Sequence, residues 1–465
     1  MQEKEKVAMR NTAKPEDVKR LEAFLQQHPE VAHVDAVFFD INGVARGKRV
    51  PREHAGKLYA GGLTLPRSLF VLDVLGDVSN GLGVGLTDGD PDGVGVPLQG
   101  DALLTPWTRQ PCAQLLMDMV EPDGSAVWFN PRYQLGLVVE KFASLGLVPV
   151  CAVEMEFYLI DPKRRGEGGQ PLAPVSPLTE ERERHARVYD LEDLESYGVF
   201  FERLDKIASA LCLPLSASST EFAPGQFEVN LTHGKDPLLA GDHACLLRQA
   251  VVQTARLCGM EATFLSKPFA KETGNGMHIH LSILDNNGKN IFQSKDAYGT
   301  VALREAVRGM QKLMAESLAV FAPHINAYRR LGSGGFAPFV RDWSYNNRLT
   351  ALRIPAGKEE SKRIEHRMAG ADANPYLVLA CVLAGALEGL ADGIEAESPL
   401  EAGTPHAQTS DLPPNLPAAL EVFENGTRLR EYLQPEYLEL YASVKRGEYE
   451  RFMGEAFERE FSWYL

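Results

Sequence analysis

The hydrophobic pattern at the start of the chain predicts a helix followed by a β-hairpin. Residues 16–27 carry apolar side chains at helical spacing. Residues 31–41 and 44–50 alternate between apolar and polar positions as strands do, and Asn42-Gly43 lies between them. An Asn-Gly pair flanked by alternating segments is the strongest short-range signal for a hairpin.

The remainder of the chain alternates between strand-like and helical segments. Residues 79–100 are rich in Gly, Asp and Pro, which predicts a long loop. We expect a small sheet-containing domain over residues 1–112 and a larger α+β domain over residues 113–465. The strands predicted in the larger domain are 114–120, 148–160, 227–231, 277–284 and 351–354. The helices predicted there are 242–258, 301–320 and 375–394.

The longest apolar run, residues 376–387, predicts a buried helix. It has about half the length that a membrane span needs. Asn374 is suited to cap the helix, and Pro375 is suited to its first position. We therefore expect no membrane partner.

Composition and charge narrow the class of protein. A hydrophobic content of 44% and a charged content of 24% are ordinary for a globular protein. The net charge of −15 argues against a nucleic-acid partner, which a basic surface would attract. The six cysteines are scattered without a C-x-x-C pair, which is typical of reduced thiols in the cytosol. The charged N-terminus predicts no signal peptide, so we expect a cytoplasmic protein.

Carboxylates and imidazoles recur in separated segments of the larger domain. On a strand, residues two positions apart point to the same face, so such pairs on adjacent strands would form an oxygen-rich cage. A cage of this kind suits Mg²⁺ or Mn²⁺ better than Zn²⁺. The residues concerned are Glu154 and Glu156, Glu221 and Glu228, His278 and His280, and Glu365.

Arginines are unusually frequent near these segments. Fixed guanidinium groups and divalent metals together favour phosphoryl transfer, because its transition state is stabilised mainly by positioning and charge. The arginines are Arg329, Arg330, Arg341, Arg348, Arg353, Arg363 and Arg367.

These segments resemble the motifs of the glutamine synthetase superfamily over nearly the whole chain. The matching segments are 106–107, 123–124, 131–132, 154–157, 224–228, 276–280, 326–331, 347–348, 363–367 and 374–376. The resemblance implies an α+β fold, with a small beta-grasp-like domain and a catalytic domain of ATP/guanido-kinase-like type. That domain has a curved antiparallel sheet surrounded by helices. The resemblance also implies a homododecamer of two hexameric rings, with active sites between subunits.

The resemblance assigns metal and nucleotide contacts residue by residue. One of the two or more divalent ions, Mg²⁺ or Mn²⁺, would be bound by Glu156, Glu221 and Glu228. Another would be bound by Glu154, His278 and Glu365. The contacts to ATP would come from His280, Ser282 and Arg353.

The remaining implied roles concern glutamate and the transferred phosphoryl group. Arg348 matches the arginine that stabilises this group. Arg330 and Arg367 match the groups that hold the glutamate carboxylates, and the Gly274 carbonyl matches a contact to the amino group. Enzymes of this family phosphorylate the γ-carboxylate of glutamate, and an amine then displaces phosphate from the γ-glutamyl phosphate.

Two differences from the motifs of ammonia-using relatives indicate that ammonia is not the preferred acceptor. Alignment on the following Ala-Pro places Phe336 where ammonia-using relatives have a catalytic Glu. The segment 65–68 also lacks the acid of the family's ammonium-binding loop, although Asp73 lies nearby. A phenyl ring cannot accept a proton, but its face offers a cation–π contact of about 0.5–2 kcal/mol.

The departures resemble the gamma-glutamylpolyamine synthetase branch, which predicts a polyamine such as putrescine as the acceptor. Ethanolamine or a monoalkylamine remains an alternative acceptor. So does ammonia, which would make the chain a glutamine synthetase in the strict sense. A catalytically silent relative is a further alternative. Such amines have a pKa near that of lysine and must lose a proton before attack, and the sequence does not indicate the proton acceptor.

Overall fold

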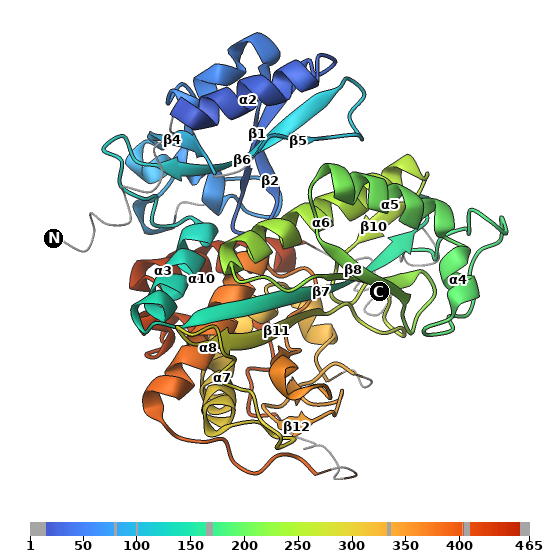
Figure 1. Ribbon diagram of the computed structural model, residues 1–465, viewed down its shortest axis with the longest axis vertical. Helices are drawn as coiled ribbons and strands as arrows, with labels where there is room; N and C mark the ends of the chain where they lie inside the picture. Colours follow the sequence, from blue (N-terminus) through green and yellow to red (C-terminus); the bar gives the residue numbers. More distant parts are fainter. Residues whose placement is uncertain are drawn as a thin grey trace.

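The computed structural model describes residues 15–78, 81–98, 101–163, 171–332, 336–401, 403 and 410–455. It contains a six-stranded sheet and an eight-stranded sheet. Figure 1 shows the first sheet, in blue and cyan, at one end of the molecule, and the second sheet among the green, yellow and orange helices.

The first sheet is built on the predicted hairpin. After α2 (Pro15–Gln27), β1 (His33–Phe39) pairs antiparallel with β2 (Ala45–Pro51). Gly43 in the connecting turn has a φ of 69°, a conformation that glycine adopts readily. The predicted helix and hairpin are therefore confirmed.

The rest of this sheet includes one strand that the sequence pattern concealed. Its order is β2-β1-β6-β4-β3, with β5 paired to β6. The prediction of one long loop over residues 79–100 is wrong, because β4 lies within it and pairs with β6. A Cβ on Gly93 would lie 2.4 Å from the Met119 sulfur, so this buried strand position has no apolar side chain to reveal it. The added strands are β3 (Thr64–Pro66), β4 (Asp92–Pro97), β5 (Leu103–Leu104) and β6 (Cys112–Val120).

The pairing of β6 affects the predicted domain boundary. β6 runs parallel to β1, with His33 opposite Cys112, and the first sheet therefore extends to Val120. The division into domains at residue 112 stays a prediction.

The second sheet carries the segments rich in carboxylates and histidines. Its order is β12-β13-β14-β11-β7-β9-β8, with β10 paired to β7. All of its pairs are antiparallel, as expected, except the parallel pair β12–β13. Its strands are β7 (Val148–Ile160), β8 (Leu215–Thr220), β9 (Gln226–Leu231), β10 (Glu261–Thr263), β11 (Met277–Leu284), β12 (Trp343–Tyr345), β13 (Leu352–Ile354) and β14 (Ile364–His366).

Helices surround the second sheet (Figure 1). The longest of them, α6 and α7, begin with the side-chain caps Asp236 and Thr300. The helices are α3 (Pro131–Ser144), α4 (Leu191–Glu195), α5 (Gly198–Ala210), α6 (Pro237–Leu257), α7 (Val301–Phe321), α8 (Pro375–Asp392), α9 (Leu416–Glu424) and α10 (Pro435–Met453).

The apolar helix α8 lies in the core. The Asn374 side chain accepts hydrogen bonds from the Tyr376 and Leu377 backbone N–H groups, and Pro375 is the first helical residue, as predicted. By length and composition α8 could cross a membrane, but 83% of it is buried inside the structure. It therefore has the burial of a core helix.

The same asparagine ties the hairpin turn to the core. Asn374 Nδ2 donates to the Asp40 and Ile41 carbonyl groups at 2.9 and 3.1 Å. Lys445 of α10 donates to Asn42 in the same turn. The hairpin of the first sheet is therefore hydrogen-bonded to the start of α8 and to α10.

Candidate active site

Strand register brings the predicted ligands together. Glu154 lies opposite His278, and Glu156 lies opposite Glu228. Glu365 of β14 lies opposite His280. Pairs two residues apart on neighbouring strands thus form one polar surface, as the sequence predicts.

Two groups of these side chains could each hold a metal ion. The candidate ligand atoms of Glu154, His278 and Glu365 all lie within 4.8 Å of one another, and so do those of Glu156, Glu228 and His278. The first group has the same members as one predicted ligand set. The second contains two members of the other set, with His278 in place of Glu221.

Glu221 follows β8 and lines the same cavity as Glu156 and Glu228. Its side chain is buried. Burial and the Glu156 carboxylate raise the pKa of Glu221 to about 8. Glu221 therefore belongs to the same crowded acidic surface, although it lies outside the tighter group.

Glu365 is bound by cations on both sides. Arg353 Nη1 donates to its Oε2 at 2.6 Å, and Arg367 Nη1 donates to its Oε1. Burial opposes ionisation, but Arg367 and the nearby histidines outweigh it and lower the pKa of Glu365 to about 2. The carboxylate is therefore charged at neutral pH.

The donor set fits divalent cations. The His278 Nδ1 atom is buried without a hydrogen-bond partner, 3.4 Å from Glu154 Oε2 and 3.9 Å from Glu228 Oε2. Several carboxylates converge on this imidazole, and a divalent ion would offset their mutual repulsion. Oxygen ligands with a single imidazole suit Mg²⁺ or Mn²⁺.

The predicted nucleotide contacts lie beside this acidic surface. His280 Nδ1 accepts a hydrogen bond from Arg363 Nε at 3.0 Å, and His280 Nε2 lies 2.8 Å from Glu154 Oε1. Ser282 is two residues further along β11, and Arg353 is on β13. These side chains come from neighbouring parts of one sheet, and their roles stay predictions.

A cavity of about 220 Å³ adjoins the acidic surface. The predicted substrate residues Gly274, Arg330, Phe336, Arg348 and Arg367 all line it. Five further lining residues had no predicted role: Tyr189, Phe222, Gln226, Thr273 and Ala337. Gln226 lies within the matched segment 224–228, and Phe222, Thr273 and Ala337 are each next to a predicted site residue, but Tyr189 lies in a charged segment without a motif.

Arg330 is held rigidly in the wall of this cavity. Its Nη1 and Nη2 atoms donate to the Met368 and Arg367 carbonyl groups at 2.9 and 3.2 Å. A Cβ on Gly276 would lie 2.8 Å from Arg330 Nη2 and 2.9 Å from His278 Nε2, so a side chain there would displace these groups.

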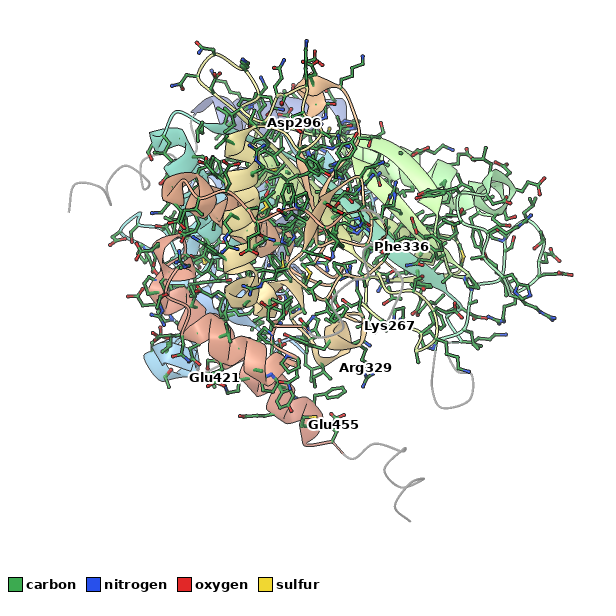
Figure 2. The ribbon with its side chains drawn as sticks, turned by 90° about the horizontal axis from the view of Figure 1, so that it is seen from below. Lys267, Asp296, Arg329, Phe336, Glu421 and Glu455 are labelled. Carbon is green, nitrogen blue, oxygen red and sulfur yellow. The ribbon has the colours of Figure 1, made fainter. Side chains whose placement is uncertain are left out.

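Phe336 makes an aromatic contact at the cavity. Its ring centroid lies 5.0 Å from that of Phe222, at an interplanar angle of 38°. The two residues are 38% and 42% exposed, so solvent reaches both rings. Figure 2 shows Phe336 beside the green part of the chain.

The segment aligned with the family's ammonium-binding loop lies elsewhere in this single chain. Arg67 pairs with Asp88 and Glu121, both at 2.7 Å. Asp73 lies 3.2 Å from Arg451. Among the described residues, none of this segment lines the cavity.

Comparison with known proteins identifies the class. Residues 129–464 match the sequence model of the glutamine synthetase catalytic domain. The chain therefore belongs to the glutamine synthetase family, and the prediction that it is a ligase is confirmed.

Individual relatives are similar to this chain over most of their length. The chain is 37% identical over 459 residues to the gamma-glutamylputrescine synthetase PuuA of Escherichia coli (strain K12), covering 98% of this chain and 96% of that protein. It is 30% identical to the glutamate–isopropylamine ligase of Pseudomonas sp., covering 91% and 92%. The solved GmaS/ADP complex superposes with a TM-score of 0.81 at 25% identity, covering 95% and 98%. The predicted α+β glutamine synthetase fold is therefore confirmed.

Proposed function

We propose that this protein joins the γ-carboxylate of L-glutamate to a primary amine of putrescine or a similar polyamine, with ATP converted to ADP and phosphate. One observation carries the choice of acceptor. The cavity that contains the carboxylates and arginines also presents the rings of Phe222 and Phe336, 5.0 Å apart. The 37% identity to a gamma-glutamylputrescine synthetase supports the same acceptor.

Two divalent ions, Mg²⁺ or Mn²⁺, complete this proposal. Glu156, Glu221 and Glu228 would hold one ion, and Glu154, His278 and Glu365 the other. Bound there, the ions would offset the charge of the phosphate groups. The geometric grouping of these side chains supports this assignment, and His278 could contribute to both sites.

The reaction has two chemical steps. A γ-carboxylate oxygen of glutamate attacks the γ-phosphorus of ATP, which forms γ-glutamyl phosphate and releases ADP. The amine nitrogen then attacks the carbonyl carbon of this acyl phosphate, loses a proton, and phosphate leaves. Both steps depend mainly on positioning and charge.

The arginines and the strand β11 would position these reactants. Arg330 and Arg367 would bind the carboxylates of glutamate, and the Gly274 carbonyl would accept a hydrogen bond from its amino group. Arg348 would stabilise the transferred phosphoryl group. The phosphates of ATP would contact His280, Ser282 and Arg353.

An aromatic acceptor site suits an alkyl amine. A phenyl face attracts a cation by about 0.5–2 kcal/mol and also covers methylene groups. Ammonium, which lacks methylene groups, gains only the weak electrostatic contact. Phe336 therefore favours a polyamine over ammonia.

A monoalkylamine acceptor is the second candidate. The relative named glutamate–isopropylamine ligase, 30% identical, favours it, because isopropylamine is a branched monoamine. Ethanolamine and ammonia complete the alternatives. We further propose that the protein is cytoplasmic, binds neither nucleic acid nor membrane, and forms two stacked hexameric rings.

A phosphate-release assay with glutamate, ATP and Mg²⁺ tests the proposal. The acceptor is varied over ammonia, ethanolamine, isopropylamine, putrescine and spermidine. We expect a diamine or polyamine to give the highest kcat/KM, and ammonia alone to give little turnover. A higher kcat/KM with ammonia or a monoamine would overturn the choice of acceptor, and no amine-dependent release would overturn the function.

A further inference from the structure

The side chain of Gln226 is a buried amide in the cavity wall. It begins β9, is 2% exposed and lines the cavity. Its Nε2 atom donates to the Gly274 carbonyl at 3.0 Å and to Asn275 Oδ1 at 3.1 Å. Its Oε1 atom accepts from Thr273 Oγ1 at 2.5 Å. Gln226 thus contacts three consecutive residues of the segment that precedes β11.

The chain on either side of Gly274 is also fixed. The Tyr158 hydroxyl donates to the Thr273 carbonyl at 2.6 Å. The Asn275 N–H donates to the Ser266 carbonyl at 2.9 Å, and the Gly276 N–H donates to Glu156 Oε2 at 2.6 Å. The hydrogen bond from Gln226 Nε2 reaches the Gly274 carbonyl from within the cavity wall.

Gly274 itself has no room for a side chain. A Cβ there would lie 2.5 Å from the Ser266 carbonyl oxygen and 2.8 Å from Arg330 Cγ. Gly274 therefore packs directly against Arg330, and both residues line the cavity. A carbonyl oxygen has two lone pairs, so one can accept from Gln226 while the other faces a ligand.

We propose that Gln226 is a positioning residue that orients the Gly274 carbonyl toward the amino group of the bound amino acid. This inference rests on the proposed function, in which that carbonyl binds glutamate. Only an amide has a donor for the two acceptors Gly274 O and Asn275 Oδ1 and an acceptor for Thr273 on one rigid group. Gln226 therefore determines selectivity for an α-amino acid without contributing to the transfer of phosphate.

The replacement Gln226→Met tests this role, because it keeps the length of the side chain and removes its hydrogen bonds. We expect the KM for glutamate to rise about tenfold, the magnitude of one hydrogen bond, with the KM for ATP changed less than about twofold. Glutarate, which lacks the amino group, provides a binding readout. Calorimetric titration of the variant should show weaker glutamate binding and unchanged glutarate binding.

Gln114→Met is the matched control. Gln114 is another buried amide, 1% exposed, and it does not line the cavity. Its Nε2 atom donates to Gln249 Oε1 at 3.2 Å. This variant should lose stability but keep the wild-type KM for glutamate. If Gln226→Met fails to fold, Thr273→Val, which removes only the hydroxyl that fixes the amide, should raise the KM for glutamate about threefold.

The outcomes separate the two proposals. If glutamate and glutarate binding weaken equally, or if the KM values for glutamate and ATP rise together, Gln226 is merely structural and the inference fails. An unchanged KM for glutamate in a folded variant also overturns it. Failure of the proposed function is distinct, because the wild-type protein itself would then show no amine-dependent phosphate release.

Discussion

Glu156 and Glu228 lie directly opposite each other on β7 and β9. Both carboxylates lie 3.9 Å from the same imidazole, that of His278. Burial, together with the carboxylates of Glu154 and Glu156, raises the pKa of Glu228 well above its ordinary value. Like charges facing each other across a sheet destabilise it, so this pair indicates a site that is built for a cation.

The variant Glu228→Gln should lose activity without losing stability. Removing one carboxylate relieves the repulsion, so the thermal midpoint in EDTA should stay level or rise. The increase of this midpoint with Mn²⁺ should shrink, and turnover should fall by about two orders of magnitude or more. Glu202→Gln on the surface of α5 is the control and should match the wild type. Retained turnover would contradict the ligand assignment.

The variant Phe336→Glu should raise the use of ammonia relative to putrescine. A carboxylate at this position could hold ammonium and accept its proton, whereas the phenyl ring cannot. We expect the ratio of kcat/KM for ammonia to that for putrescine to increase at least about tenfold. Phe336→Leu removes the ring without adding a charge and should not increase ammonia use. A flat ratio for Phe336→Glu would show that the acceptor pocket lies elsewhere.

The variant Phe222→Leu should weaken the acceptor amine selectively. It keeps an apolar side chain but removes the ring that lies 5.0 Å from Phe336. Loss of a cation–π contact of about 0.5–2 kcal/mol predicts a 2- to 30-fold higher KM for putrescine. The KM for glutamate should stay unchanged. An equal rise for both substrates would indicate a general distortion of the cavity.

The variant Asn374→Ala should destabilise the protein strongly. It removes the cap of α8 and the side-chain donor to the Asp40 and Ile41 carbonyl groups, of which Asp40 keeps the Gly43 N–H. We expect a loss of about 2–4 kcal/mol, measured as a lower thermal midpoint. Asn415→Ala is the matched control, because Asn415 caps α9 through the Ala418 N–H alone, and it should cost about 1 kcal/mol. Equal losses would contradict the docking role of Asn374.

Acid should destabilise the protein partly through His324. Burial and the Lys445 ammonium lower the pKa of His324 from 6.5 to about 4. Between these values the unfolded chain binds a proton that the folded protein does not, so the free energy of unfolding falls as pH falls. The contribution is about 1–3 kcal/mol, present above pH 6.5 and lost toward pH 4. His324→Asn should have a smaller decrease in thermal midpoint between pH 7.5 and 5 than the wild type, and an identical decrease would contradict this.

The sequence predicted those elements in which apolar and polar side chains repeat at the spacing of a helix or a strand. The hairpin, the apolar helix α8 and the ligand pairs of β7 and β11 were all evident in this way. β4 was not, because Gly93 and Gly95 occupy positions where Met119, Phe38 and Leu63 fill the space. Tyr189 was also missed, since its place at the cavity depends on a positive φ of 61° rather than on a motif. Contacts of this kind are formed only in the folded chain.

Alternate residues of β11 face opposite sides of the sheet and have different roles. His278 and His280 face the acidic surface, whereas Ile279, Leu281 and Ile283 are fully buried on the opposite side. Substitutions on the apolar side can therefore adjust stability while the ligands keep their places. Inserting or deleting a single residue within β11 would exchange the two sides and place imidazoles in the hydrophobic interior. The length of this strand is thus more tightly constrained than the identity of its core residues.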